Sequence, residues 1–356
     1  MINSLEINNL KCVKNIQMEC RNLNVLIGTN SSGKSTILQA LLLVGQNLEP
    51  VEGLNGKLVE LGKFEDAKCI YSADKELDIT INSDNNSCIK TKMVLDRDSE
   101  SYFVHTECSA GQPIEEWQKR LSIKKRRLQY LSCHRIGPRK VYPKNMTLDD
   151  VIGIDGEYAM SYLNQHGKDI VEPEMCKGNV DFTLLGQMNW WLSYIMDSTI
   201  MTEDISGTDL IKVSYQMNDM ENIRPGNIGA GISYLIAILV MCLSSPEKGV
   251  LIIENPEIHL HPSAQAKVCE FLYFIAARDR QIFVETHSDH IFNGFRVGMA
   301  TKSMREELLN IQFVYLNEQH LAEAIKVKIG KRGKIENQRK DLFDQFDLDL
   351  NKMIGL

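Results

Sequence analysis

The sequence contains no Cys-x-x-Cys pair, no apolar run long enough to span a membrane and no excess of basic residues. Its nine cysteines are odd in number and scattered, which argues against a zinc site or a disulfide framework and favours reduced, buried thiols. The longest apolar run, residues 235–243, is about half the length of a membrane-spanning helix. The N-terminus has neither the basic nor the apolar segment of a signal peptide. These features predict a cytoplasmic protein without a membrane contact.

The charge balance limits the partners that the whole surface can attract. Forty Lys and Arg residues against forty-seven Asp and Glu residues give a formal net charge of −7. This argues against electrostatic binding of nucleic acid over the whole surface but leaves room for a local basic patch. The chain of 356 residues is longer than a typical single domain, and one large α/β domain with an insertion fits this length.

The hydrophobic pattern predicts α/β segments at both ends of the chain and a mixed insertion between them. We expect strands at residues 58–61, 77–81, 91–95 and 102–106, an antiparallel β-meander, and helices at 157–165 and 182–196. Strand–helix alternation returns with strands at 211–215, 250–253 and 281–284 and helices at 232–243, 263–277 and 289–297. The expected divisions are an N-terminal α/β lobe (1–110), a helical insertion (111–208), a C-terminal α/β lobe (209–318) and a small C-terminal module (319–356).

The strongest local signal is the loop of residues 28–36, which matches the pattern G-x-x-x-x-G-K-S between an apolar strand and an amphipathic helix. Its glycines allow the backbone N–H groups to point at phosphate oxygens, and the helix that follows adds its dipole. Lys34 would reach the β- and γ-phosphates of ATP, and Ser35 would coordinate Mg²⁺. The predicted nucleotide-binding residues of this loop are Asn30, Ser31, Ser32, Gly33, Lys34, Ser35 and Thr36.

A second signal is the apolar run that ends in a carboxylate, Glu254, followed by Asn-Pro-Glu. A buried strand of an open α/β sheet delivers such an acid at its C-terminal edge, where a metal ligand belongs. Glu254 is therefore the predicted second Mg²⁺ ligand and Glu257 the residue predicted to polarise the attacking water. A plain strand followed by a turn and a helix cap is the structural alternative.

Two weaker signals lie at helix and strand ends. A Gly-rich turn precedes the apolar helix at 232–243 and would be a second phosphate cradle, which suggests action across a dimer; a plain tight turn explains it equally well. A strand ending in Thr-His places His287 near the same sheet edge, where it would sense the γ-phosphate. The predicted nucleotide-binding residues of the turn are Asn227, Gly229, Gly231 and Ser233.

Taken in order, these four elements resemble the ABC-type ATPase head of the SMC and RecF-like proteins. They resemble more closely the prokaryotic OLD-like AAA ATPases, whose acidic strand reads Glu-Asn-Pro-Glu-x-His-Leu-His-Pro, as residues 254–262 do here. Stretches at 55–62, 130–138, 155–157, 189–192 and 341–346 extend the resemblance over nearly the whole chain. The implied fold is an ABC-type P-loop ATPase head with a mixed α/β sheet, an antiparallel β-meander and a helical insertion.

The resemblance implies Walker A at residues 28–36, Walker B at Glu254, a signature-like loop at 227–233 and a switch histidine at His287. Asn255 stands where these proteins carry the catalytic Glu, so the resemblance implies slow or partner-dependent hydrolysis. It also implies head-to-head dimers that use ATP and Mg²⁺ to regulate a separate effector. The expected effector is an HNH nuclease, as in the Septu anti-phage systems.

Two further interpretations of the sequence concern nucleic acid. A basic run would contact DNA or a partner, and a solvated helix end is the alternative. The run is Lys124, Lys125, Arg126 and Arg127, with Arg135, Arg139 and Lys140 following. The acidic residues near the C-terminus are expected to form a solvated helix face and not a nuclease metal site. A DNA-repair ATPase, a nuclease acting on its own and a non-hydrolysing ATP-binding scaffold remain alternative functions.

Overall fold

A six-stranded sheet forms the centre of the computed structural model. The structure describes residues 1–84, 87–96, 101–109, 112–147, 149–178, 181–343, 349–350 and 352–354. All strands of the sheet run parallel except the edge strand β15, so the C-terminal ends of β3, β13 and β12 lie side by side. In spatial order the strands are β15 (Ala322–Lys326), β14 (Leu309–Leu316), β3 (Leu23–Gly28), β13 (Gln281–Glu285), β12 (Val250–Glu254) and β7 (Leu128–Leu131).

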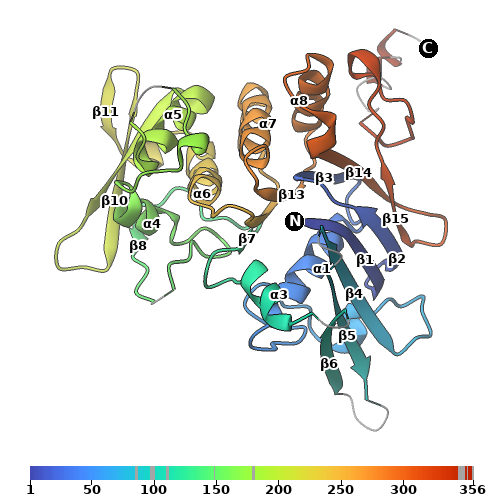
Figure 1. Ribbon diagram of the computed structural model, residues 1–356. Helices are drawn as coiled ribbons and strands as arrows, with labels where there is room; N and C mark the ends of the chain where they lie inside the picture. The colour runs from blue at the N-terminus through green and yellow to red at the C-terminus, as the bar shows by residue number, and fades with distance from the viewer. Residues whose placement is uncertain are drawn as a thin grey trace.

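Each face of the central sheet is covered by a separate hydrophobic core, which is why β12 and β13 are continuous apolar runs. Leu26 and Phe283 pack on one face with helix α1 (Lys34–Gln46). Val25 and Val284 face the opposite way, toward α7 (Pro262–Ala276) and α8 (Asp289–Ala300), which stand side by side in Figure 1.

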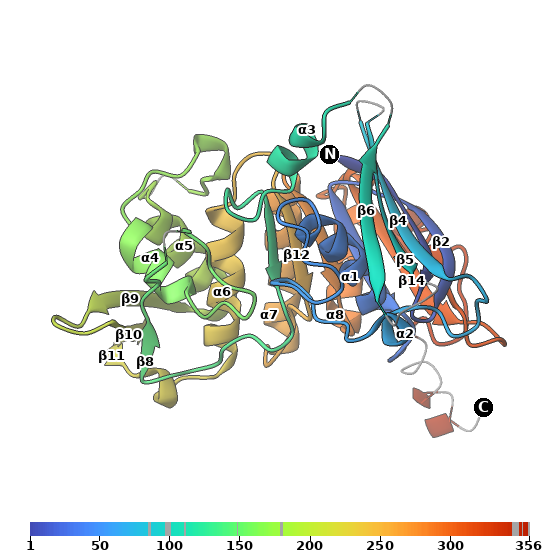
Figure 2. The same ribbon diagram turned by 90° about the horizontal axis from the view of Figure 1, so that it is seen from below.

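An antiparallel sheet lies beyond α1 and shares its core (Figure 2). Its strands in spatial order are β2 (Val13–Glu19), β1 (Ile2–Leu10), β4 (Glu76–Ser83), β5 (Cys88–Leu95) and β6 (Tyr102–Cys108). The short helices α2 (Phe64–Ala67) and α3 (Ile114–Arg120) lie near it.

An outer lobe occupies the other end of the molecule (Figures 1 and 2). Helix α6 is buried on nearly all sides, as its all-round apolar sequence requires. The helices of the lobe are α4 (Ala159–His166), α5 (Leu184–Met196) and α6 (Gly231–Leu243), and its strands are β8 (Val141–Pro143), β9 (Ser198–Asp204), β10 (Leu210–Met217) and β11 (Met220–Ile223). The 3₁₀ turns of the described chain are η1 (Pro173–Met175), η2 (Pro225–Asn227), η3 (Glu306–Leu308) and η4 (Lys331–Gly333).

The structure contains every helix and strand expected from the hydrophobic pattern except the strand at 58–61, which is wrong. That segment is an irregular loop because the Gln46 side chain accepts hydrogen bonds from the backbone N–H groups of Leu58 (3.3 Å) and Val59 (3.1 Å), taking the place of a neighbouring strand. Residues 111–208 contribute β7, β8 and β9 as well as helices.

The end of the chain differs in part from expectation. Strands β14 and β15, which the pattern did not suggest, complete the central sheet, so residues of the expected small module belong to it. Residues 344–348 of that module, including the acidic Asp344 and Asp347, lie outside the described part of the chain. No helix among the described residues has the length and apolar character needed to cross a membrane.

Candidate nucleotide-binding site

The loop between β3 and α1 depends on its two glycines. Gly28 has φ 147°, and a Cβ atom there would lie 2.0 Å from the backbone oxygen of Val314 on β14. Gly33 has φ 106°, and its Cβ would meet Ala322 of β15 at 2.9 Å. Larger residues would therefore displace the loop from the central sheet.

Lys34 contacts its own loop, whereas Ser35 contacts the end of strand β13. The Lys34 ammonium donates to the backbone oxygens of Gly28 (3.1 Å) and Thr29 (2.7 Å), and burial lowers the pKa of this lysine. The Ser35 hydroxyl donates to Oε1 of Glu285 (2.9 Å). Of the other predicted loop residues, Ser32, Gly33 and Thr36 are buried, while Asn30 and Ser31 are exposed.

Glu254, at the end of β12, is buried and both of its oxygens accept hydrogen bonds from the neighbouring chain segment. The Tyr130 hydroxyl on β7 donates to Oε1 (2.9 Å), and the Cys133 N–H donates to Oε2 (3.1 Å). Burial, then the Glu254 charge, raises the pKa of Tyr130, which keeps the phenol protonated as a donor. Glu254 thus lies at the expected sheet edge but is directed to β7.

Glu257 joins the loop after β12 to the loop after β13. It accepts hydrogen bonds from the Thr286 hydroxyl (2.8 Å), the His287 N–H (2.8 Å) and the Asn255 amide (3.2 Å). A carboxylate offers about four acceptor sites, so room for a water hydrogen remains. The predicted neighbours Glu257 and His287 are therefore brought together.

The His287 side chain is exposed, and its Nε2 lies 3.8 Å from Oε1 of Glu285. Partial burial and then the charge of Lys34 lower the pKa of His287, so the neutral imidazole dominates at neutral pH.

Sequence reasoning missed Glu285, the carboxylate that contacts Ser35. The signal was present, because β13 ends in a glutamate after an apolar run just as β12 does. Burial, partly offset by the Ser35 hydrogen bond, raises the pKa of Glu285.

Arg135 was interpreted only as an extension of the basic run, yet it is buried and holds the site. Its guanidinium donates to the backbone oxygens of Ser132 (2.8 Å), Glu254 (2.5 Å) and Asn255 (2.6 Å). Burial lowers its pKa to about 10, so it remains charged at neutral pH. Arg135 therefore fixes the loop after β12 against the loop after β7.

The Gly-rich turn at 227–233 contacts the outer lobe and the loop after β12. The Ser233 hydroxyl lies 3.3 Å from the Tyr215 hydroxyl, and a Cβ on Gly231 would meet the His259 backbone oxygen at 2.5 Å. Asn227 and Gly229 are exposed. Among the hydrogen bonds and ion pairs of the described residues, none joins this turn to the loop at 28–36.

Only part of the basic run faces solvent. Arg126 is buried, lies 4.1 Å from the Tyr162 ring centre and donates to the Tyr162 and Ser244 hydroxyls. Arg127 is half-buried and donates to the Glu247 backbone oxygen, so neither arginine is free for DNA.

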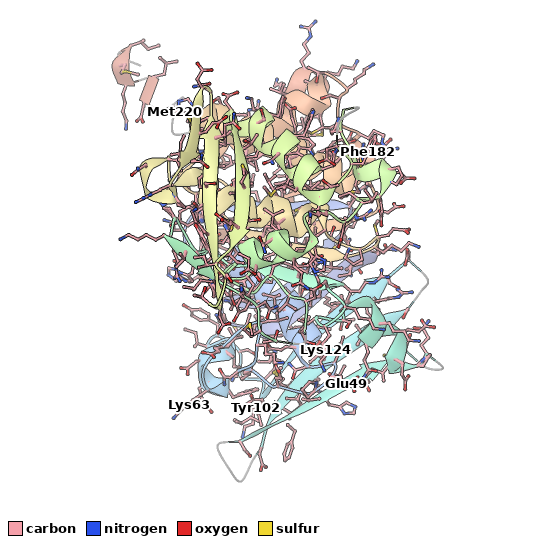
Figure 3. All side chains as sticks on the ribbon, turned by 90° about the vertical axis from the view of Figure 1, so that its left-hand side faces the viewer. Glu49, Lys63, Tyr102, Lys124, Phe182 and Met220 are labelled. Carbon is pink, nitrogen blue, oxygen red and sulfur yellow. The ribbon has the colours of Figure 1, made fainter. Side chains whose placement is uncertain are left out.

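Lys124 and Lys125 are exposed, but acidic residues accompany the first of them. Lys124 and Glu49, both labelled in Figure 3, line one cavity of about 770 Å³ beside β7. Acidic side chains on the same wall weaken the attraction of this patch for phosphates. The acidic lining residues are Glu49, Glu52, Asp149 and Glu157.

The residues at the loop suit a nucleotide phosphate and a divalent cation. The Ser32 hydroxyl and Oε2 of Glu285 are buried without a hydrogen-bond partner among the described residues, one a donor and the other an acceptor. In that part of the chain no three His, Cys, Asp or Glu residues are grouped to hold a metal. Mg²⁺ needs no such group, because it usually takes one or two carboxylates and completes its shell with phosphate oxygens and water.

Two family models and one sequence relative match this chain. Residues 1–148 match a family model described as "AAA ATPase domain", and residues 117–293 match one described as "AAA domain, putative AbiEii toxin, Type IV TA system". An OLD nuclease of Thermus scotoductus is 22% identical over 388 residues, which cover 96% of this chain and 70% of that protein.

Two solved SMC heads share the fold. One, bound to the C-winged helix domain of ScpA, has a TM-score of 0.56 at 14% identity over 92% of this chain and 98% of that chain. The other, from Pyrococcus furiosus with an extended coiled coil and bound to the C-terminal domain of ScpA, has a TM-score of 0.55 at 11% identity over 100% and 99%.

Both family models describe AAA domains, and the likeness to SMC heads confirms the predicted ABC-type head fold. The chain is related to OLD nuclease in sequence and to SMC heads in fold.

Proposed function

We propose that this chain binds ATP with Mg²⁺ at residues 28–36 and hydrolyses it. The observation that carries the proposal is the hydrogen bond from Ser35 to Glu285 at the end of β13, directly before the loop in which the His287 N–H donates to Glu257. On binding, Lys34 would leave the carbonyls of its own loop for the phosphates. When bound, Mg²⁺ would neutralise the charge that develops on the phosphates. Glu257, held by three donors, would orient the attacking water.

A head-to-head dimer would complete the site with the Gly-rich turn of a second copy. Gly229 is exposed, has no positive φ, and an added Cβ there would meet no atom of its own chain within 4 Å. The chain itself therefore gives no reason for a glycine at this position, whereas close approach of a second chain does. ATP would then be an interface ligand whose hydrolysis resets the assembly.

We further propose that nucleotide-driven assembly regulates a separate effector, a nuclease of the HNH type in a Septu-like anti-phage system. Relatives in fold are seen with bound partner domains, and the relative in sequence is named a nuclease. Exposed Lys124 and Lys125 would supply a weak DNA contact.

Multiple-turnover phosphate release in Mg²⁺ tests the activity. Lys34→Ala and Glu257→Gln should each lower the rate about a hundredfold or more, whereas Lys340→Ala, at an exposed position, should not change it. Size measurement with and without ATP tests the assembly, for which Glu257→Gln should hold the ATP-bound form. If the wild-type chain bound no ATP in calorimetry, the proposed function would be wrong. An assembly state that ignored ATP in wild type and in Glu257→Gln would remove gating by dimerisation.

A further inference from the structure

Two glutamates end neighbouring strands at the nucleotide site, and they differ in what surrounds them. Glu285 on β13 pairs with Leu26 of β3, the strand that carries the phosphate loop. Glu254 on β12 pairs with Glu285 and is thus one strand farther from the loop. Position in the sheet therefore gives Glu285 the closer approach to the phosphates.

The hydrogen bonds make the same distinction. Oε1 of Glu285 accepts from the Ser35 hydroxyl (2.9 Å), while Oε2 is buried and has no hydrogen-bond partner among the described residues. The residue is only 4% exposed, so water does not satisfy this oxygen freely. A buried carboxylate oxygen without a partner costs free energy and is retained where a ligand supplies the partner.

Glu254 has no oxygen left without a donor. Tyr130 and the Cys133 N–H occupy one oxygen each, and both donors come from the β7 side of the sheet. These donors hold the Glu254 carboxylate toward β7, and β7 lies on the side of β12 away from the phosphate loop. Moving the carboxylate to a cation beside Ser35 would weaken both contacts.

We propose that Glu285, together with Ser35, is the protein carboxylate that binds the divalent cation of the nucleotide, and that Glu254 is a positioning residue that holds β7 and the loop after it. The proposal rests on the proposed ATP binding. One carboxylate, one hydroxyl and phosphate oxygens are a usual protein environment for Mg²⁺. The Ser35–Glu285 hydrogen bond joins the two groups that would share the cation, so both already lie within reach of one point.

The test measures how strongly Mg²⁺ tightens binding of a non-hydrolysable ATP analogue, by calorimetry in Mg²⁺ and in EDTA. In Glu285→Gln, affinity in EDTA should match wild type, while the tightening by Mg²⁺ should fall about tenfold or more. In Glu254→Gln the tightening should persist. Mn²⁺ in place of Mg²⁺ gives a direct readout, because the paramagnetic resonance spectrum of bound Mn²⁺ should broaden or change in Glu285→Gln and not in Glu254→Gln.

Several outcomes would overturn the assignment. Full Mg²⁺ tightening in Glu285→Gln with loss of phosphate release would make Glu285 a general base and not a ligand. If only Glu254→Gln lost the Mg²⁺-dependent tightening of nucleotide binding, the cation ligand would be Glu254 and not Glu285. If Glu285→Gln did not fold, Glu285→Asp serves instead, since the shorter side chain withdraws the carboxylate from the cation and should reduce the tightening without affecting affinity in EDTA. A wild-type chain that bound no nucleotide even in EDTA would refute the proposed function itself, which is a distinct result.

Discussion

Replacing Arg135 by methionine should destabilise the fold and disable the site together. The guanidinium donates to three backbone oxygens, which belong to Ser132, Glu254 and Asn255. A hydrogen bond from a charged group contributes about 1.5–3 kcal/mol net. Three such bonds are offset in part by the cost of burying the charge, which is the cause of the pKa lowered to about 10. We therefore expect Arg135→Met to lower the free energy of unfolding by roughly 3 kcal/mol.

Urea denaturation followed by circular dichroism measures this change, and Arg139→Met is the matched control. Arg139 is exposed, so its replacement should change stability by no more than about 0.5 kcal/mol. Arg135→Lys separates geometry from charge, because a lysine cannot reach three carbonyls with the planar fork of an arginine and should lose most of the same stability.

The reasoning would be refuted by equal stability of the Arg135 and Arg139 variants. In that case, a matching loss of DNA affinity in both would support the interpretation of Arg135 as part of a basic nucleic-acid patch. The buried contacts of Arg135 predict a loss of stability in Arg135→Met and none in Arg139→Met. Phosphate release should also fall in Arg135→Met, because the loop that carries Glu257 is no longer fixed.

Three more outcomes are expected. Gly28→Ala should destabilise the fold in urea denaturation, because its Cβ would lie 2.0 Å from a backbone oxygen. Gly229→Ala should leave the stability of a single chain unchanged, but it should remove ATP-dependent assembly in a sizing experiment. The free energy of unfolding of the nucleotide-free chain should fall as pH rises from the ordinary glutamate pKa of 4.5 through the raised pKa of Glu285, because the folded state binds this proton more tightly than the unfolded state does. In urea denaturation at several pH values, Glu285→Gln should show a smaller fall of this free energy with pH. Lys124→Glu with Lys125→Glu should weaken any DNA binding and flatten its salt dependence, and an unchanged salt slope would remove this contact.

Local pattern was enough to predict the Gly-rich loop after β3 and the apolar strands β3, β12 and β13, but not the other three strands of the central sheet, β7, β14 and β15. Each of these depends on neighbouring residues, such as a glycine that permits the turn or an apolar run that demands burial. Strand β14 was missed although Asn310 and Gln312 alternate with apolar residues, a period typical of a strand with one solvated face; here both polar side chains are buried. The Asn310 amide donates to the backbone oxygen of Glu19 (2.7 Å), far away in the sequence, so its burial is satisfied by a contact that no local pattern reveals.

The roles of Glu285 and Arg135 escaped for the same reason. Ser35 and Glu285 are 250 residues apart in the chain, and Arg135 meets the loop after β12 across 119 residues. A carboxylate at a strand end can be noticed in a sequence, but whether its oxygens face Ser35 or Tyr130 depends on the order of strands in the sheet. The order of the strands, which the sequence does not give, is what places Glu285 beside Ser35 and Glu254 beside Tyr130.

The backbone and a neighbouring carboxylate both favour asparagine at position 255, where the resemblance to OLD-like ATPases would place a catalytic glutamate. The φ of Asn255 is 43°, in the left-handed region that asparagine tolerates better than glutamate does. Its amide also donates to Glu257, so a carboxylate at 255 would replace that attraction with repulsion. An asparagine therefore serves both the backbone and the orientation of the carboxylate two residues further on. Asn255 is thus compatible with the proposed hydrolysis, in which Glu257 would orient the water and the Asn255 amide helps to hold Glu257 in place.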